Sequence, residues 1–482
     1  MDHLASPSEV QSTIEGKTGY SFTNWAKTFS CKPELYFCPE NEDELIKILH
    51  KATQLDKKIK VVGCGNSPSD IACTEDYMVN MTKMNKLLKV DKEKSIITVQ
   101  AGVTIKDLCE NYLPQHELAL STAGSYSNIS LGGAVSTGTH GSGINYGNIS
   151  SYVLELDILL PSGEKIHCSR TENEEIFLSA CCGIGAVGIM LNITIKCEPA
   201  FRLEQHTYPA PLSEVMAKLP DHLAASDHFR FLWYPHTDQV VISHVNRTEK
   251  NELEKKDLRG HQESETTRWH IDDDEQKIRF WIEIYMMASK AMSWLQPLSL
   301  TFWPHVLVPI INRTFFNLIF SQKQHIIDDG FRVFSFECLF KQYVNEWAVP
   351  IDRCAMVLQR LGEWLEKYPK AYAHLPVEVR FVKGDDLYIS PAFNQTMCYI
   401  NIIMYRPYGM LVPFRDYWNA YENIMRTEGG RPHWAKAHQE TSKNFRSMYP
   451  QWKKWCEIQK KSDPRGRFLN SYLERILNNG GR

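Results

Sequence analysis

The order of apolar and polar positions divides the chain into two halves of different character. In the first half, apolar residues recur at helical spacing over Asn41–Asp56, and strand patterns follow at Ser95–Val99, Leu154–Leu160 and Gly185–Ile195. Alternating helix and strand signals over roughly 200 residues predict an α+β domain of ordinary size. A break in the pattern falls near Glu198–Phe201.

Strand signals dominate the second half of the chain. They cover Phe229–Tyr234, Val240–His244, Val333–Leu339, Val377–Phe381 and Cys398–Tyr405. Helical spacing appears at Leu358–Lys367 and again near the C-terminus at Phe468–Ile476. This combination predicts a sheet with helices covering it.

Composition excludes several classes of partner. The chain has 482 residues, a net charge of −3 and no long run of like charge, so no nucleic-acid partner is expected. Its 13 cysteines form no CxxC pair and no Cys/His spacing suited to zinc, which predicts reduced thiols and no metal site. Residues 1–20 contain no apolar core, so no secretory signal is expected.

One uncharged segment complicates this interpretation. Residues 291–312 contain no Lys, Arg, Asp or Glu, a length that would suit a membrane span, but Pro297, Pro304 and Pro309 argue against a straight helix. Aromatic residues gather over 291–320, as at a bilayer interface. Membrane association through 291–320 and a buried core of the second domain are both open alternatives.

Residues 121–147 carry the most chemical information, and they read STAGSYSNISLGGAVSTGTHGSGINYG. Seven glycines lie among serine and threonine hydroxyls, and no Lys, Arg, Asp or Glu is present. Glycines allow the backbone to approach a ligand closely, and free amides and hydroxyls donate to phosphate or ring oxygens. Because the stretch also contains Ile129, Leu131 and Val135, it does not resemble a flexible linker. It predicts a buried cofactor loop.

Two further glycine turns accompany this loop. Residues 61–70, VVGCGNSPSD, read as a strand end followed by a tight turn of amides, which suits a pyrophosphate. Their spacing matches neither the Rossmann GxGxxG motif nor a P-loop. The turn at 183–189, GIGAVGI, either presents backbone donors to a flat heterocycle or is a plain strand connection.

In this order the three loops resemble the FAD-binding domain of the vanillyl-alcohol-oxidase type of flavoproteins. The motifs PVEVRF (376–381), MYRPYG (404–409), GRPHWAKAH (430–438) and DPRGRFL (463–469) are similar to those of the sugar-lactone oxidases. The resemblance implies an α+β fold with an FAD-binding domain at 1–200. A cap domain with a mainly antiparallel sheet covered by helices would follow at 201–428, and a segment at 429–482 would return to the FAD domain. The FAD contacts that the resemblance implies are Val62, Gly63, Cys64, Gly65, Asn66, Ser67, Gly124, Ser125, Ser130, Gly133, Thr137, His140, Gly143, Gly188, Ile189 and Lys436.

The predicted strand at 377–381 carries the candidate catalytic pair. Glu378 and Arg380 are two residues apart and therefore point to the same face, where they could orient a polyol and a lactone carbonyl. Such a pair is usually structural, but the resemblance assigns these positions to substrate and flavin contacts. It also implies that Lys436 is a second cation at the flavin or substrate and that Ser125 contacts substrate. His433 is a candidate partner or base, although a lone His is usually structural.

One position departs from the family pattern. Animal members have a His where this chain has Asn66, and that His carries a covalent bond to the flavin. Because an amide nitrogen is a poor nucleophile, we expect FAD to be bound without a covalent link.

The resemblance implies oxidation of an aldono-1,4-lactone by O₂ to a ketolactone, with release of H₂O₂. L-gulono-1,4-lactone is the first expectation, D-arabinono- or L-galactono-1,4-lactone is the alternative, and a flavin-binding protein without turnover is a third. Attachment to the endoplasmic reticulum membrane is expected from the family, with a cytoplasmic location as the alternative. Pocket shape and oligomeric state are not readable from the sequence.

Overall fold

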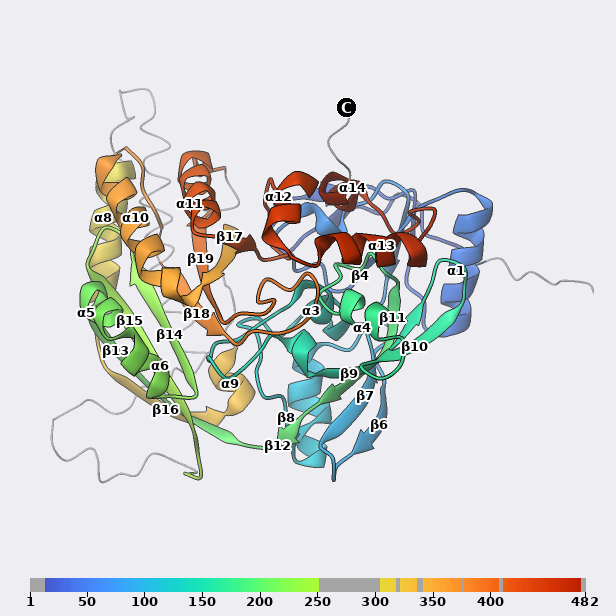
Figure 1. Cartoon of the computed structure of the whole chain (residues 1–482), viewed down its shortest axis with the longest axis horizontal. Helices are drawn as coiled ribbons and strands as arrows, with labels where there is room; N and C mark the ends of the chain where they lie inside the picture. Colours follow the sequence, from blue (N-terminus) through green and yellow to red (C-terminus); the bar gives the residue numbers. More distant parts are fainter. Residues whose placement is uncertain are drawn as a thin grey trace, which may run out of the picture.

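Two bodies of structure lie side by side in the computed structural model, which describes residues 14–250, 304–317, 321–335, 341–368, 370–374, 376–406 and 411–477 (Figure 1). One body contains a three-stranded and a five-stranded sheet, and the other is built on an eight-stranded sheet. The fold is α+β, as the sequence predicts. No helix in the described ranges is both long enough and apolar enough to cross a membrane.

The first body begins with a small parallel sheet. Its strands, in spatial order, are β3 (Leu35–Phe37), β5 (Tyr77–Asn80) and β4 (Ile59–Val62), and helix α1 (Glu42–Gln54) connects β3 to β4. The side chain of Asn41 accepts a hydrogen bond from the Glu44 amide and so caps α1. The predicted helix at Asn41–Asp56 is thus confirmed to within two residues.

The five-stranded sheet of this body is antiparallel. Its order is β10 (Lys165–Ser169), β9 (Val153–Leu159), β11 (Ile189–Lys196), β7 (Ile96–Gln100) and β6 (Leu87–Asp91). Helices α3 (Leu131–Thr137) and α4 (Glu174–Ala180) pack against it in one hydrophobic cluster. Short elements complete the body: β1 (Phe22–Thr23), β2 (Ser30–Cys31), α2 (Ile105–Asp107), β8 (Leu118–Ala119) and β12 (Glu198–Pro199), with single helical turns at Asp70–Ala72, Leu108–Tyr112, Pro114–His116 and Ile149–Tyr152.

The eight-stranded sheet of the second body is antiparallel throughout. Its order is β16 (Gln324–Asp329), β13 (Arg202–Pro211), β15 (Gln239–Thr248), β14 (His228–Tyr234), β18 (Val377–Val382), β19 (Met397–Tyr405), β17 (Gln342–Pro350) and β20 (Arg431–Pro432). The helices of this body are α5 (Leu212–Ala217), α6 (Leu219–Ala224), α8 (Pro304–Phe315), α9 (Gly330–Phe334), α10 (Cys354–Lys367) and α11 (Arg415–Thr427).

The two faces of this sheet differ in chemistry because side chains alternate along each strand. One face is apolar: Phe231 pairs with Val379, Val379 with Ile400, and Ile400 with Trp347, and this row packs under α10 and α11. The alternate positions form a polar row across the same strands, namely Arg230, Arg380 and Tyr399 in one register and Glu378, Asn401 and Glu346 in the next. The charged face is turned toward the first body, as contacts from Arg380 to Ser125 show.

The C-terminal helices α12 (Ser442–Met448), α13 (Trp452–Ser462) and α14 (Ser471–Leu477) lie over the first body (Figure 1). Trp434, Trp455 and Tyr472 belong to the same hydrophobic cluster as Leu131 and Val135 of α3. The indole N–H of Trp455 also donates to the carbonyl of Ser179 at 3.0 Å. The end of the chain therefore completes the core of a body that begins near its start.

One predicted strand is wrong where the structure describes it. Val333 and Phe334 lie in helix α9, whereas 336–340, the rest of the predicted strand Val333–Leu339, fall outside the described residues. A Cβ on Gly330 would come 2.5 Å from the ring of Phe201, so a larger residue at the start of the helix would have to displace that ring. Of the two helical residues of the predicted strand, Phe334 is buried and Val333 is partly buried.

The uncharged segment 291–320 is described only in part. Residues 291–303 and 318–320 lie outside the described residues, and α8 covers most of the rest. Val308, Asn312 and Phe316, spaced four apart on one side, are buried. The amide of Asn312 donates to the carbonyls of Pro235 and Ala373, at 3.1 and 3.0 Å. This part of the segment thus packs as cap-domain core.

Candidate active site

The first glycine loop leaves a row of backbone donors without partners. Residues 63–67 follow the end of β4, and their amide N–H groups donate to no group in the described part of the chain. A Cβ on Gly63 would lie 1.9 Å from the hydroxyl of Ser130, the residue whose side chain caps α3 through the Gly133 amide. The two loops therefore meet, and a row of free amides beside a helix start has the donors that the pyrophosphate of FAD requires.

Asn66 lies where these loops meet. Its side-chain amide donates to the carbonyl of Asn128 at 2.5 Å, which fixes it against the second glycine loop. Cys64, its neighbour in the loop, is a free thiol whose pKa is raised by burial, so it is a weak nucleophile at neutral pH.

Other residues of the second glycine loop form hydrogen bonds to the second body and within α3. Gly143 has a φ of +144°, and its amide donates to the carbonyl of Phe381 on β18 at 2.6 Å. The hydroxyl of Thr137 donates to the carbonyl of Gly133 within α3. The Gly143 bond holds the loop against β18 of the large sheet, whereas the Thr137 bond stabilises α3 itself.

The third turn is explained by packing. A Cβ on Gly188 would come 2.2 Å from a methyl group of Ile158, so glycine is needed where β11 starts beside β9. Ile189 is buried in the core below it. Their contact with FAD stays a prediction from the family.

Arg380 joins the second glycine loop to the sheet. Its guanidinium donates to the hydroxyl of Ser125 at 3.2 Å, to the carbonyl of His140 at 3.4 Å and to the carboxylate of Glu346 at 2.5 Å. Its Nε lies 3.6 Å from Glu378, which also pairs with Arg230 at 3.5 Å. The predicted pair Glu378–Arg380 is thus brought together with Ser125 in one buried network.

Glu346 is the central residue that the sequence analysis missed. It lies on β17, is fully buried, and reaches Arg380, Lys436 (3.5 Å) and the Nε2 of His140 (3.4 Å). Burial alone would raise the pKa of Glu346, but the charges of Arg380 and Lys436 outweigh it and hold the pKa well below its usual range. The available signal was a Glu flanked by apolar residues in the unassigned run YVNEWAV.

Two histidines complete this cluster in their neutral form. Burial lowers the pKa of His140, and it lowers the pKa of His433 further, because neither imidazolium could be hydrated. The Nδ1 of His433 accepts the amide of Ala435 at 3.0 Å, so a proton on the neutral ring resides on Nε2. The ring of His140 packs on Tyr399 with 3.8 Å between centroids. His140, His433 and Glu346 place potential metal ligands within 4.8 Å of one another, although two cations already neutralise the carboxylate.

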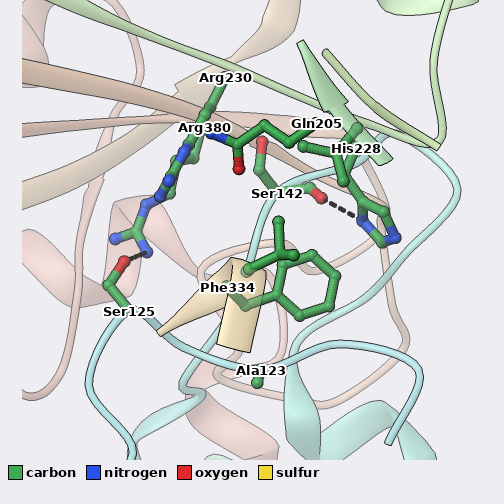
Figure 2. Close-up of a pocket in the computed structure, with 11 residues that line it drawn as sticks. Ala123, Ser125, Ser142, Gln205, His228, Arg230, Phe334 and Arg380 are labelled. Atoms are coloured by element: carbon green, nitrogen blue, oxygen red, sulfur yellow. Dashed lines mark hydrogen bonds between the residues drawn. The ribbon is translucent and has the colours of Figure 1, made fainter. Parts of the chain in front are cut away.

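A pocket opens beside Ser125 and Arg380 (Figure 2). Arg230 and Gln205 of the sheet line one side, and Phe334 of α9 forms a wall opposite. Val333 of α9 also lines the pocket. The Nε2 of Gln205 donates to Thr207 at 2.9 Å, and Nδ1 of His228 donates to the carbonyl of Ser142 at 2.8 Å. The pocket therefore presents guanidinium and amide groups opposite an apolar wall.

The charges of this site do not cancel. Arg230, Arg380 and Lys436 bring three positive charges, and Glu346 and Glu378 bring two negative ones, which leaves one positive charge. A net positive, largely buried site stabilises negative charge that develops on a bound molecule. The site can hold a polyhydroxylated substrate by its oxygens and stabilise the negative charge that a transferred hydride brings to an acceptor beside it.

Comparison with known proteins agrees with this geometry. Residues 193–476 match the D-arabinono-1,4-lactone oxidase family, and residues 33–169 match the FAD binding domain. L-gulonolactone oxidase of Scyliorhinus torazame is 44% identical over 463 residues, covering 96% of this chain and 99% of that protein. The enzyme of the same name from Mus musculus is 43% identical, covering 96% and 100%. Cholesterol oxidase from B. sterolicum shares the fold alone, with a TM-score of 0.75 at 15% identity, covering 99% of this chain and 100% of that one.

The fold and the site define an FAD-dependent oxidoreductase of the vanillyl-alcohol-oxidase type. Within that class, the chain belongs to the sugar-lactone oxidase family, to which the D-arabinono-1,4-lactone oxidases and the animal L-gulonolactone oxidases belong.

Proposed function

We propose that this enzyme oxidises L-gulono-1,4-lactone to the ketolactone that becomes ascorbate, with O₂ as the electron acceptor. The secondary alcohol loses a hydride from carbon and a proton from oxygen, and two electrons and two protons convert O₂ to H₂O₂. Bound FAD would supply the hydride acceptor, whereas the protein supplies orientation and electrostatics. The observation that carries the proposal is the net positive charge of the buried network at the pocket mouth.

Each group in the network has a part in this reaction. Ser125 and Arg380 lie together at the pocket and can hold the ring oxygens of the lactone. Glu378, held between Arg230 and Arg380, can accept hydrogen bonds from the hydroxyl groups. Lys436 and Arg380 stabilise negative charge on the flavin or substrate. The neutral imidazole of His433 uses Nδ1 to accept the Ala435 amide, so its Nε2–H can donate a hydrogen bond to a bound oxygen.

A flavin-reduction assay tests both the reaction and the substrate. Purified holoenzyme is mixed anaerobically with L-gulono-, D-arabinono- and L-galactono-1,4-lactone, and bleaching of the yellow flavin is followed. We expect the fastest bleaching with L-gulono-1,4-lactone. Arg380→Ala, Glu378→Ala and Lys436→Ala should each slow it by about ten- to a thousand-fold, as other preorganised polar groups do. Unchanged bleaching in all three folded, flavin-loaded variants would move the active site elsewhere.

We also propose that FAD is held without a covalent bond. Asn66 stands at the position of the flavin-linking His, and its amide is engaged with the carbonyl of Asn128. Acid precipitation should leave the yellow colour in the supernatant. A flavin-labelled peptide in the pellet would contradict the proposal.

Attachment to the endoplasmic reticulum membrane is proposed from the uncharged, aromatic-rich sequence of residues 291–303. Contact made by burying aromatic side chains does not depend on surface charge, so it should survive a high-salt wash of the membrane fraction. Protein found wholly in the high-speed supernatant would assign the whole segment to the cap core and favour a cytoplasmic location.

A further inference from the structure

A second cluster of potential metal ligands lies on the large sheet, at its β16 edge. Glu204 and His206 are two residues apart on β13 and so share a face, and His325 of β16 pairs directly with His206. Their ligand atoms all lie within 4.8 Å of one another. Sequence spacing alone could not show this group, because His325 lies more than a hundred positions away from Glu204 and His206 along the chain.

The three ligand atoms converge. The Nε2 of His325 lies 2.7 Å from Oε1 of Glu204, and the Nε2 of His206 lies 3.6 Å from the same oxygen. The two imidazole rings are stacked with 4.1 Å between centroids. Ligands about 2.0–2.1 Å from a tetrahedral zinc ion lie roughly 3.3 Å apart. The edge from His325 to Glu204 would therefore open by about 0.6 Å, and the edge from His206 to Glu204 would close by about 0.3 Å.

The chemistry of the group also suits a cation. His206 is half-exposed, His325 is partly exposed at 30%, and Glu204 is mostly covered at 16%, so an ion could reach them from solvent. The ammonium of Lys250 lies 3.0 Å from the Glu204 carboxylate, so a positive charge already occupies this position.

We propose that Glu204, His206 and His325 form a surface site for a divalent transition-metal ion, with Zn²⁺ as the best match to two imidazoles and a carboxylate. Solvent would supply the fourth ligand. The ion would tie the edge strand β16 to β13 and, through β16, hold the start of α9, which forms one wall of the pocket. It would take no part in the oxidation, because the ligands lie outside the Arg380 network.

Titration of tag-free, chelator-treated holoenzyme with Zn²⁺ tests the site. We expect one ion per chain by calorimetry and a higher thermal midpoint in its presence. His206→Ala and His325→Ala should each weaken binding about tenfold or more and abolish the thermal shift. Lys250→Ala should strengthen binding, because it removes the competing cation.

His244→Ala is the matched control. His244 lies on β15 directly opposite His206, and it contacts His222 of α6 at 3.1 Å without a carboxylate in the pair. Its loss should therefore leave Zn²⁺ binding unchanged. Flavin absorbance verifies that every variant is folded. Absence of binding, or full binding in His325→Ala, would overturn the proposal. Loss of binding only in His433→Ala would place the ion in the buried cluster and would also overturn it.

Discussion

At the scale of single residues, the site depends on one carboxylate, Glu346, that the sequence analysis did not predict and that contacts the predicted residues Arg380 and Lys436. Glu346 neutralises part of the charge of Arg380 and Lys436. Its replacement by the isosteric Gln removes this negative charge and leaves the two cations close together. We expect Glu346→Gln to slow flavin reduction by lactone about ten- to a thousand-fold and to raise the flavin midpoint potential. Breaking a buried pair should also lower the free energy of unfolding by about 3–5 kcal/mol.

A matched control separates charge from folding in this prediction. Glu422 is also buried and accepts a hydrogen bond from Asn345 at 2.8 Å, but it lies on α11, behind the apolar face of the sheet. Glu422→Gln should therefore leave the flavin potential unchanged. Equal potentials in wild type and a folded, flavin-loaded Glu346→Gln variant would show that Glu346 does not influence the flavin.

Gly124 is the second residue with a testable role. A Cβ there would lie 2.8 Å from a methyl group of Thr139, so the loop is closely packed. In the family, a small residue at this position leaves room for O₂ beside the flavin. We expect Gly124→Ala to slow reoxidation by O₂ more than reduction by lactone, as stopped-flow absorbance would measure.

Removing the colliding methyl group distinguishes two causes of that effect. The double variant Gly124→Ala with Thr139→Ser keeps the new Cβ but relieves the clash. If the added methyl blocks O₂, reoxidation stays slow in the double variant. Recovery to the wild-type rate would assign the effect to a displaced loop instead.

At the scale of elements, the sequence predicted the helices and strands whose own residues show an unbroken helical or alternating pattern. Strands β14, β15, β18 and β19 and helices α1 and α10 follow from alternation or helical spacing. Strand β17 was not predicted, because Asn345 and Glu346 interrupt its apolar run, and the same interruption hid the central carboxylate. The pair Glu378–Arg380 was found because both residues share one strand, whereas Arg230 and Gln205 reach the pocket from strands paired through tertiary structure.

Helix α9 provides a prediction at this scale, since it forms the wall of the pocket. Phe334 contacts the ring of His228 edge-on, with 4.7 Å between centroids. Phe334→Ala should open the pocket and lower the KM for lactones with a longer side chain relative to L-gulono-1,4-lactone. Initial rates with a seven-carbon lactone would measure this, and an unchanged ratio of kcat/KM values would remove α9 from substrate selection.

At the scale of the whole molecule, buried histidines should set its response to acid. Burial lowers the pKa of His228, His236 and His244 to about 4, and of His374 and His438 to about 3. A folded-state pKa below the unfolded value of 6.5 gives stability that is present above pH 6.5 and is lost as pH falls toward 4. Each such group adds a slope of about 1.4 kcal/mol per pH unit in that window.

The thermal midpoint should therefore fall steeply between pH 6.5 and 4. Asp385 opposes this trend, because burial raises its pKa to about 6. Its contribution to the free energy of unfolding is therefore lost as the pH rises through 6, not as the pH falls. His228→Gln should remove the contribution of one titrating proton from the pH dependence of the thermal midpoint. The variant should still fold, because Gln can donate to the carbonyl of Ser142. An identical pH dependence in this variant would contradict the assignment.

The return of the C-terminal helices to the first body has a consequence for how the enzyme is made. Trp434, Trp455 and Tyr472 fill the same core as Leu131 and Val135, so this core stays incomplete until Tyr472 has left the ribosome. The glycine loops that would hold FAD are supported by that core, so we expect them to reach their final conformation only after these residues have packed. Loading of the vitamin-derived cofactor is therefore a late, post-translational event, and a nascent chain stalled before residue 434 should emerge colourless.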